Sequence, residues 1–213
     1  MTSNMNQTSN YKMKTHQKIY LPLKRLIDIF GSILGILVCF ILLWWWIIPI
    51  NAIATKGHPF FVQQRLGKHK KVFGLIKFRS MRMDADPNKA PSGMDVKEQA
   101  SMETGFGKFL RKTSLDETMQ LLNIFVGQMS FIGPRPGAAI NEEDLVIARE
   151  KYTPNAYEVK PGLGGLAQNK MRRDHDPEKK AEFDSEYVKK ISLWFDIKLF
   201  FATIFRLFYG GAR

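Results

Sequence analysis

The chain has 213 residues and a net charge of +12, a length that suffices for one domain with a hydrophobic core. Its single cysteine, Cys39, excludes an intrachain disulfide. Residues 1–83 contain 13 basic residues and one acid, whereas the remainder contains equal numbers of bases and acids. All of the excess positive charge therefore lies on either side of one apolar segment.

We predict three regions along the chain. Residues 1–17 are polar and basic and are expected to be disordered. Residues 18–54 contain the apolar segment, which has no charge from 29 to 54 and is long enough to cross a bilayer. The run of Trp44, Trp45 and Trp46 and the flanking cations favour a membrane helix over a buried core helix. Residues 55–213 are expected to form a small domain on the cytoplasmic face of the membrane.

The charges around the apolar segment bear on its topology. Spanning helices usually carry excess Lys and Arg on their cytoplasmic side only, but here both flanks are basic. This favours a re-entrant helix that enters the bilayer and turns back, although a spanning helix remains the alternative. Pro49 and Asn51 are candidates for the break, whereas Gly31 and Gly35 would allow close helix packing.

The rest of the chain predicts an α+β fold that is mostly helical. Strands are expected at 60–64 and 72–78, separated by a basic turn, and a mobile loop at 84–103. Helices are expected at 106–112, 115–126, 142–151 and 177–190, and an amphipathic helix at 191–211 is expected to lie in the membrane interface. The basic segment 56–82 predicts contact with membrane lipids or phosphates, and no nucleic-acid partner is expected because no binding motif is present.

Two adjacent acids, Asp116 and Glu117, are the candidate catalytic residues. By itself the pair fits a capping box, with Ser114 as the N-cap, and Gly127 suits the end of the same helix. The same position also suits phosphoryl chemistry, because a helix N-terminus stabilises a carboxylate and attracts phosphate. Arg111 before the pair and Arg135 after it supply forked donors for phosphate oxygens.

The segment SLDETMQLLNIFVGQMSFIGPRP, residues 114–136, resembles the signature of the bacterial sugar transferases. These are monotopic phosphoglycosyl transferases that start glycan or exopolysaccharide assembly on a lipid carrier. Three further segments resemble the same family, namely KRLIDIFGS at 24–32, FVQQRLGKHKKVFGLIKFRSM at 61–81 and VKPGLGGLAQ at 159–168. The resemblance therefore extends over most of the chain.

The resemblance implies a reaction and its residues. In that family the Asp of the acid pair attacks the β-phosphate of a UDP-sugar, UMP leaves, and polyprenol (undecaprenyl) phosphate then takes the sugar phosphate from the Asp. It implies Asp116 as the nucleophile, with Mg²⁺ held by Glu117 and Asp116, at the cytoplasmic face of the inner membrane. The implied substrate- and phosphate-binding residues are Lys77, Arg79, Arg111, Arg135, Arg172 and Asp184.

Some questions stay open at this point. Many family members have a Ser-Pro pair near the middle of the membrane helix, and here residues 38–42 contain neither residue. The choice between Arg172 and Arg173, the identity of the sugar and the oligomeric state, including a homodimer, are also undecided. The competing hypothesis is a non-catalytic, membrane-anchored scaffold of a polysaccharide assembly complex, whose function would not need Mg²⁺ or the Glu117 carboxylate.

Overall fold

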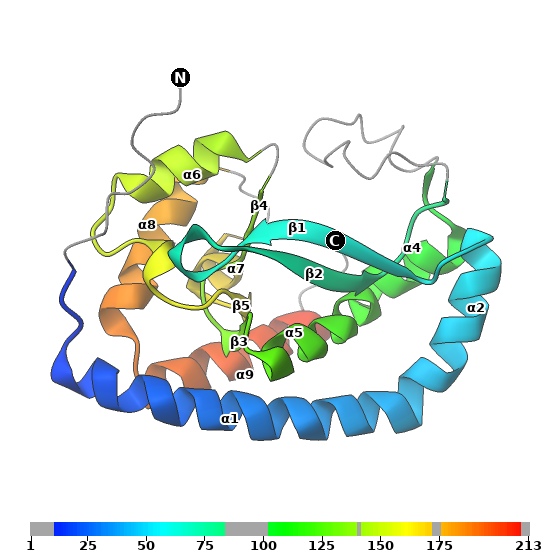
Figure 1. Cartoon of the computed structure of the whole chain (residues 1–213), viewed down its shortest axis with the longest axis horizontal. Coiled ribbons are helices and arrows are strands. Elements are labelled where there is room, and N and C mark those ends of the chain that lie inside the picture. The colour runs from blue at the N-terminus through cyan, green and yellow to red at the C-terminus, as the bar shows by residue number, and fades with distance from the viewer. Residues whose placement is uncertain (1–10, 84–101, 140–141, 172–175, 210–213) are drawn as a thin grey trace.

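The structure is a computed structural model that describes residues 11–83, 102–139, 142–171 and 176–209. Within these residues the protein is mostly helical with a few short strands, which confirms the predicted α+β class. A long helix runs along one side of the molecule, and the other elements lie together above it (Figure 1). Of residues 1–17, which were predicted to be disordered, 1–10 lie outside the described residues, whereas 15–17 form the start of the long helix. Most of the predicted mobile loop, 84–101, also lies outside the described residues.

The long helix has three parts: α1 (Thr15–Cys39), the π-helical turn η1 (Phe40–Trp44) and α2 (Trp45–Thr55). Figure 1 shows that α2 leaves the line of α1 steeply at η1. The prediction of a break at Pro49 or Asn51 is therefore wrong. A proline removes the hydrogen bond to the carbonyl four residues earlier, here Trp45, so its bend falls on its N-terminal side.

The polar and apolar faces of α1 are exchanged relative to those of a helix that packs on the core of a water-soluble protein. The side chains that it buries against the domain are mostly polar, whereas large apolar side chains such as Phe30 and Leu34 are 70% and 63% exposed. The buried residues are Gln17, Tyr20, Lys24, Asp28, Ser32 and Cys39. An apolar outer face on a helix of this length suits lipid rather than water. The 41-residue helix Thr15–Thr55 is also the one helix among the described residues that is long and apolar enough to cross a membrane.

Specific contacts attach α1 to the domain. Asp28 Oδ1 accepts hydrogen bonds from Ser130 Oγ and from the backbone N–H of Phe131, at 3.0 and 3.1 Å. Gly31 and Gly35 face neighbouring side chains so closely that a Cβ would lie 2.8 Å from the Phe131 ring and 3.1 Å from Leu121 Cδ1, respectively. The predicted close helix packing is confirmed at Gly35, because Leu121 belongs to a helix, whereas Gly31 packs closely against a strand residue.

The strands form two small sheets. Strands β1 (Phe60–Leu66) and β2 (Val72–Phe78) form an antiparallel hairpin around the 3₁₀ turn η2 (Lys68–Lys70), and β4 (Gly137–Ala138) adds to β1 to give the order β2-β1-β4. Strands β3 (Ser130–Ile132) and β5 (Gly162–Gly164) pair in parallel. The hairpin was predicted, although β1 is two residues longer than expected.

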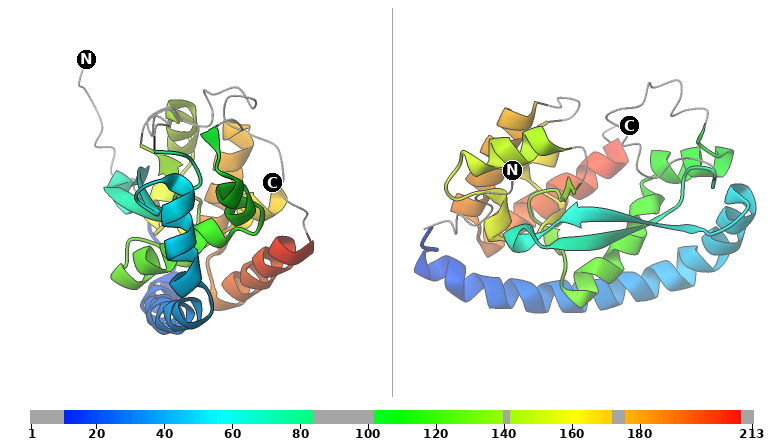
Figure 2. Two further views of the ribbon diagram at one scale, coloured as in Figure 1. Left: turned by 90° about the vertical axis from the view of Figure 1, so that its right-hand side faces the viewer. Right: turned by 45° about the horizontal axis from the view of Figure 1, so that its top comes forward.

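The predicted helices lie close to their expected positions, except at 115–126, and the short helices at 156–158 and 166–170 were not predicted. The segment 115–126 is divided into the 3₁₀ helix η4 (Leu115–Met119) and α5 (Gln120–Val126). The others are α4 (Gly105–Lys112), α6 (Glu143–Glu150), η5 (Ala156–Glu158), α7 (Leu166–Lys170), α8 (Pro177–Lys190) and α9 (Leu193–Tyr209). Figure 2, which views α1 nearly end-on in its left panel, shows α9 and α5 close to the level of α1, with α6 and α8 farther away.

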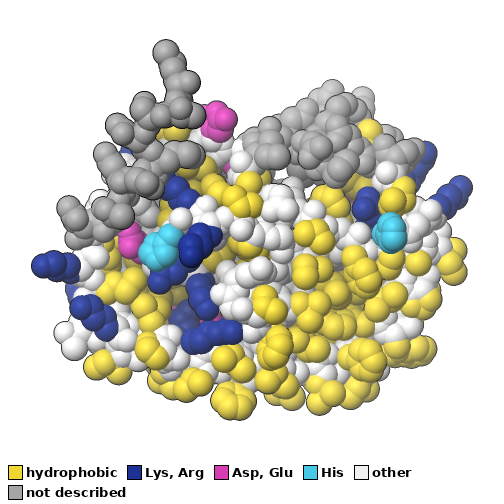
Figure 3. All heavy atoms as spheres, in the orientation of Figure 1, with side chains coloured by type: hydrophobic (Ala, Val, Ile, Leu, Met, Phe, Trp, Pro, Cys, Tyr) yellow, Lys and Arg dark blue, Asp and Glu magenta, His cyan; other side chains and the backbone are white. Residues whose placement is uncertain are grey.

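Apolar side chains continue from α1 onto α9, where Trp194, Phe201 and Phe205 are 67%, 63% and 64% exposed. The one acid near the start of α9, Asp196, is instead buried and accepts hydrogen bonds from the hydroxyls of Tyr20 and Tyr187. In Figure 3 the apolar side chains cover the lower and right-hand parts of the visible surface, and the cations gather at the left above them. This distribution is that of a protein with one side in an apolar medium.

Candidate active site

Asp116 and Glu117 lie in η4, between α4 and α5. Ser114 adopts a left-handed conformation, with φ of 56°, and its side chain makes no capping hydrogen bond, so the predicted capping box is wrong. The left-handed residue redirects the chain as it leaves α4, and Glu117 N–H donates to the Ser114 carbonyl instead, at 3.2 Å. Gly127 does end α5 as predicted, with φ of 90°.

Both acids are buried, with 5% of Asp116 and 8% of Glu117 exposed. Arg135 Nη2 donates to Glu117 Oε1 at 3.1 Å. The nearby Glu117 carboxylate raises the pKa of Arg135, which therefore stays charged across the physiological range. The structure thus brings the predicted pair and the predicted Arg135 into one site.

The β1–β2 hairpin adds two further cations. Phe61 faces Lys77 and Arg65 faces Phe73 across the hairpin, so Arg65 and Lys77 lie on the same face. Burial, together with the neighbouring Arg135 and Arg65, lowers the pKa of Lys77 to about 8, against the attraction of Glu117 and Asp116. Burial, with Arg135 nearby, also lowers the pKa of Arg65. Two carboxylates and three cations therefore share one poorly hydrated site.

Sequence reasoning missed Arg65. The signal was the alternation in strand β1, which places Arg65 on the covered face with Gln63 and Phe61. The strand was predicted to end at residue 64, so Arg65 was assigned to the turn that follows it. Arg79 is two residues after Lys77, and its guanidinium carbon lies 5.6 Å from the centroid of the Phe61 ring on the same hairpin.

Two other predicted binding residues form ion pairs with residues outside the acid pair. Arg111, on α4, forms an ion pair with Glu103. Asp184, on α8, is 1% exposed and accepts hydrogen bonds from Arg149 Nε and Nη2 at 2.9 and 2.5 Å. Arg172 lies outside the described residues.

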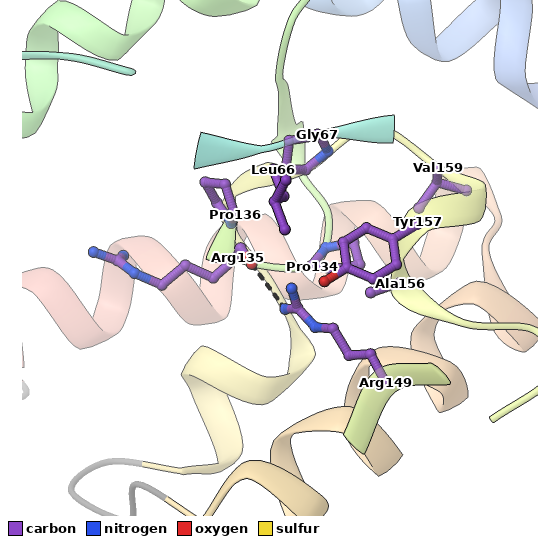
Figure 4. A pocket seen from close by; sticks show the side chains of 10 residues that line it. Leu66, Gly67, Pro134, Arg135, Pro136, Arg149, Ala156, Tyr157 and Val159 are labelled. Carbon is purple, nitrogen blue, oxygen red and sulfur yellow. Dashed lines mark hydrogen bonds between the residues drawn. The ribbon is translucent and has the colours of Figure 1, made fainter. Parts of the chain in front are cut away.

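Arg149 connects Asp184 to the site. Its Nη2 also donates to the Arg135 carbonyl at 2.8 Å, as drawn in Figure 4. The same view shows a small cavity beside Arg149, Tyr157 and Pro134, with the Arg135 side chain pointing out of it. Asp184 and Arg149 therefore fix the backbone of Arg135 from behind. Sequence reasoning missed Arg149, which carries no local signal because its partner is 35 positions away.

The donor set bears on the predicted Mg²⁺. Among the described residues no group of three His, Cys, Asp or Glu side chains is arranged to hold a metal. Mg²⁺ is commonly bound by one or two carboxylates together with water and substrate phosphates, rather than by a cage of protein ligands. Adjacent Asp116 and Glu117 fit that mode of binding.

The chain matches known proteins over most of its length. The family model for bacterial sugar transferases matches residues 19–210. A galactosyl transferase, CpsE, of Streptococcus agalactiae is 35% identical over 91% of this chain and 44% of its own length. A UDP-glucose:undecaprenyl-phosphate glucose-1-phosphate transferase of Escherichia coli is 38% identical over 75% of this chain and 35% of its own length.

An undecaprenyl-phosphate galactose phosphotransferase of Salmonella typhimurium is 37% identical over 85% of this chain and 39% of its own length. The chain thus spans less than half the length of these curated relatives. The family model covers most of α1 and all of the hairpin, the acid pair and α9, so the match includes every element that builds the site. The chain belongs to the bacterial sugar transferase family.

Proposed function

We propose that this protein transfers a sugar-1-phosphate from a UDP-sugar to polyprenol phosphate, giving polyprenol-diphosphate-sugar and UMP. A carboxylate oxygen of Asp116 attacks the β-phosphorus, and the bond from that phosphorus to the bridging oxygen breaks, so that UMP leaves with the bonding electrons. A phosphate oxygen of the polyprenol phosphate then attacks the same phosphorus and releases the Asp116 carboxylate.

The observation that carries the proposal is the charge arrangement of the buried site. An anionic nucleophile and an anionic diphosphate repel each other, so the reaction needs fixed cations around the phosphorus. Arg135 is held at Glu117 by an ion pair and by its own backbone contact to Arg149. Lys77 and Arg65 lie on the hairpin face beside it. Restricted hydration strengthens each of these interactions.

Mg²⁺ is part of the proposal, with Glu117 and Asp116 as its protein ligands. The ion would neutralise charge on the diphosphate of the donor. The side chains that surround the pair supply the rest: Arg135 orients the Glu117 carboxylate through its 3.1 Å hydrogen bond, and Lys77 adds positive charge toward the donor.

The proposed location is the cytoplasmic face of the inner membrane, with α1, η1 and α2 inserted as a re-entrant helix and α9 in the interface. The apolar outer face of α1 and the polar inner face that it turns toward the domain support insertion. A helix that bends at η1 and returns would keep the site at the membrane surface, where the phosphate of a polyprenol carrier lies.

The test is a UMP-release screen of the purified protein over several UDP-sugars, with undecaprenyl phosphate and Mg²⁺. We expect one or more donors to release UMP and Asp116→Asn to abolish release. Asp144→Asn is the matched control, because Asp144 lies in the first turn of α6 and is exposed. UMP release that is unchanged in Asp116→Asn would overturn the proposal, and absence of release with every donor would favour the scaffold hypothesis.

A further inference from the structure

The bend of the membrane helix and the catalytic turn touch at one point. Trp44, the last residue of η1, donates a hydrogen bond from its indole Nε1 to Thr118 Oγ1 at 3.1 Å. Thr118 directly follows Asp116 and Glu117 in η4. The two residues are 74 positions apart in the chain, so this contact joins the apolar segment to the turn that carries the acid pair.

Thr118 also bonds to the residue at the start of its own turn, Leu115. Its hydroxyl accepts from Trp44 and donates to the Leu115 carbonyl at 2.8 Å. A hydroxyl has a single hydrogen, so accepting from Trp44 leaves that hydrogen for Leu115. The bonds thus connect the first residue and the fourth residue of η4 and hold Asp116 and Glu117 between them. A short 3₁₀ turn has weaker hydrogen bonds than an α-helix and gains most from such support.

The three consecutive tryptophans have different surroundings. Trp44 is 6% exposed and belongs to a core cluster with Leu110, Met119 and Leu121. Trp45 is 66% exposed on the apolar side. Trp46 donates its indole N–H to the Leu42 carbonyl at 2.9 Å and packs edge-on against Phe106. The run is therefore more than an interfacial aromatic cluster.

Trp46 donates a side-chain hydrogen bond to a carbonyl of the bend itself. In a π-helical turn the regular i to i+4 bonds are displaced, and carbonyls at the bend need other donors when water is scarce. Leu42 lies within η1 and receives the Trp46 indole in addition to any backbone donor. This side-chain bond holds the bend, and Trp44, at the end of the same turn, is held facing Thr118.

We infer that Trp44 is a positioning residue for the proposed reaction, which fixes the catalytic turn from the bend of the membrane helix through Thr118. This inference rests on the proposed function. Trp44 is hydrogen-bonded to the turn that carries the nucleophile, whereas Arg135 and Lys77 lie on other elements. Loss of the indole N–H is therefore expected to lower kcat while leaving the KM for the UDP-sugar unchanged.

The experiment compares Trp44→Phe with Trp45→Phe in the full-length protein in lipid nanodiscs. Trp44→Phe keeps an aromatic ring in the core and removes the donor, and one neutral hydrogen bond of this kind corresponds to about a three- to tenfold fall in kcat. Trp45→Phe changes an exposed ring and is expected to retain kcat within about twofold. An equal kcat for Trp44→Phe and the wild type would overturn the inference.

Thr118 supplies the second arm. Thr118→Ser keeps the hydroxyl and should retain kcat, whereas Thr118→Val should lose at least as much kcat as Trp44→Phe. If the two residues act through one bond, Trp44→Phe combined with Thr118→Val should be no worse than Thr118→Val alone. Multiplicative losses in the double variant would show that Trp44 acts by another route.

Hydrogen exchange of the peptide that contains residues 115–119 gives a readout that does not depend on activity. Trp44→Phe should speed exchange there and leave β3 (Ser130–Ile132) unchanged, whereas unchanged exchange at 115–119 would contradict the inference. If the wild type releases no UMP with any donor, the proposed function fails, and the exchange measurement still decides whether the contact holds the turn.

Discussion

At the level of single residues, the site depends on buried charged side chains that water reaches poorly. Glu117 is 8% exposed and carries the ion pair to Arg135, and Asp116 beside it is 5% exposed. A neutral amide at either position would keep the shape and remove the charge. Isosteric substitutions can therefore distinguish the role of Asp116 from that of Glu117.

For Glu117 the informative change is Glu117→Gln. Loss of one carboxylate ligand is expected to raise the Mg²⁺ concentration for half-maximal UMP release by about tenfold or more, since ligands of Mg²⁺ in proteins are few. The measurement is a Mg²⁺ titration of UMP release, with Glu143→Gln on the exposed first turn of α6 as the control. An unchanged titration curve would remove Glu117 from the proposed metal site.

Lys77 predicts a pH dependence. Its pKa is lowered to about 8, so the ammonium loses its proton near pH 8 and its attraction for phosphate is lost above it. We expect the KM for the UDP-sugar to rise several-fold between pH 7 and 9. Lys77→Arg keeps its charge over this range and should show a smaller rise in KM. An equal rise in KM in the wild type and in Lys77→Arg would mean that another group causes the pH dependence.

The same group predicts the opposite trend in stability. In the unfolded chain Lys77 keeps its proton up to the ordinary lysine pKa of 10.5, whereas in the folded protein it loses it near 8. The unfolded state therefore binds more protons between these values, and the contribution of Lys77 to the free energy of unfolding rises with pH in that window. If UDP-sugar binding weakens with rising pH while the free energy of unfolding increases, Lys77 is identified as the titrating group.

At the scale of elements, α6 and α8 are joined by two ion pairs of very different burial. Arg149 and Asp184 have side chains that are each 1% exposed, and Lys151 and Glu178 have side chains that are 57% and 51% exposed. Asp184→Asn leaves Arg149 with an uncompensated buried charge and is expected to lower the free energy of unfolding by about 3 kcal/mol or more.

The exposed pair is the matched control, because Glu178→Gln is expected to cost less than about 0.5 kcal/mol. Denaturant unfolding of both variants in the same detergent measures the difference. Since Arg149 also donates to the Arg135 carbonyl, Asp184→Asn should lower UMP release as well. Equal stability of the two variants would mean that the buried pair does not hold the Arg135 loop.

Most of the elements could be predicted from local patterns. The helix Pro177–Lys190 matches its predicted bounds because Asp176 caps its start through the N–H groups of Glu178 and Lys179 and Pro177 begins it. The hairpin follows from two strand-like runs around a basic turn. Strands β3, β4 and β5 escaped prediction because each has only two or three residues and pairs with a distant segment.

The site was predictable in part. Asp116, Glu117 and Arg135 carry a motif within one segment, and the structure brings them together. Arg149 and Trp44 carry no such signal, because their roles come from tertiary contacts to residues 35 and 74 positions away. The mark of the bend at η1 is displaced along the chain: η1 itself contains no proline, Pro49 follows it by five residues, and the Leu42 carbonyl within η1 accepts a hydrogen bond from the Trp46 side chain.

At the scale of the whole molecule, the exchanged faces of α1 predict how the protein holds the membrane. Leu34 is 63% exposed on α1, and Leu34→Glu would place a charge in the apolar medium at a cost of about 2 to 3 kcal/mol. The variant is expected to leave the membrane fraction more readily in high-salt and alkaline washes.

Ile147 provides the control for that change. It is 55% exposed on α6, which lies on the side of the molecule away from α1 (Figure 1). Ile147→Glu should therefore leave membrane retention unchanged. Retention that falls equally in both variants, or in neither, would contradict an insertion that depends on the outer face of α1.

In the proposed reaction Asp116 carries the sugar phosphate between the two transfers, and intact-protein mass spectrometry can detect this covalent intermediate. The protein is incubated with a UDP-sugar that supports UMP release, without polyprenol phosphate, and quenched in acid. We expect an added mass equal to one sugar phosphate less one water, located on Asp116 by peptide mapping, absent in Asp116→Asn and removed when polyprenol phosphate is added. UMP release with no adduct, or an adduct that persists in Asp116→Asn, would contradict the proposed intermediate.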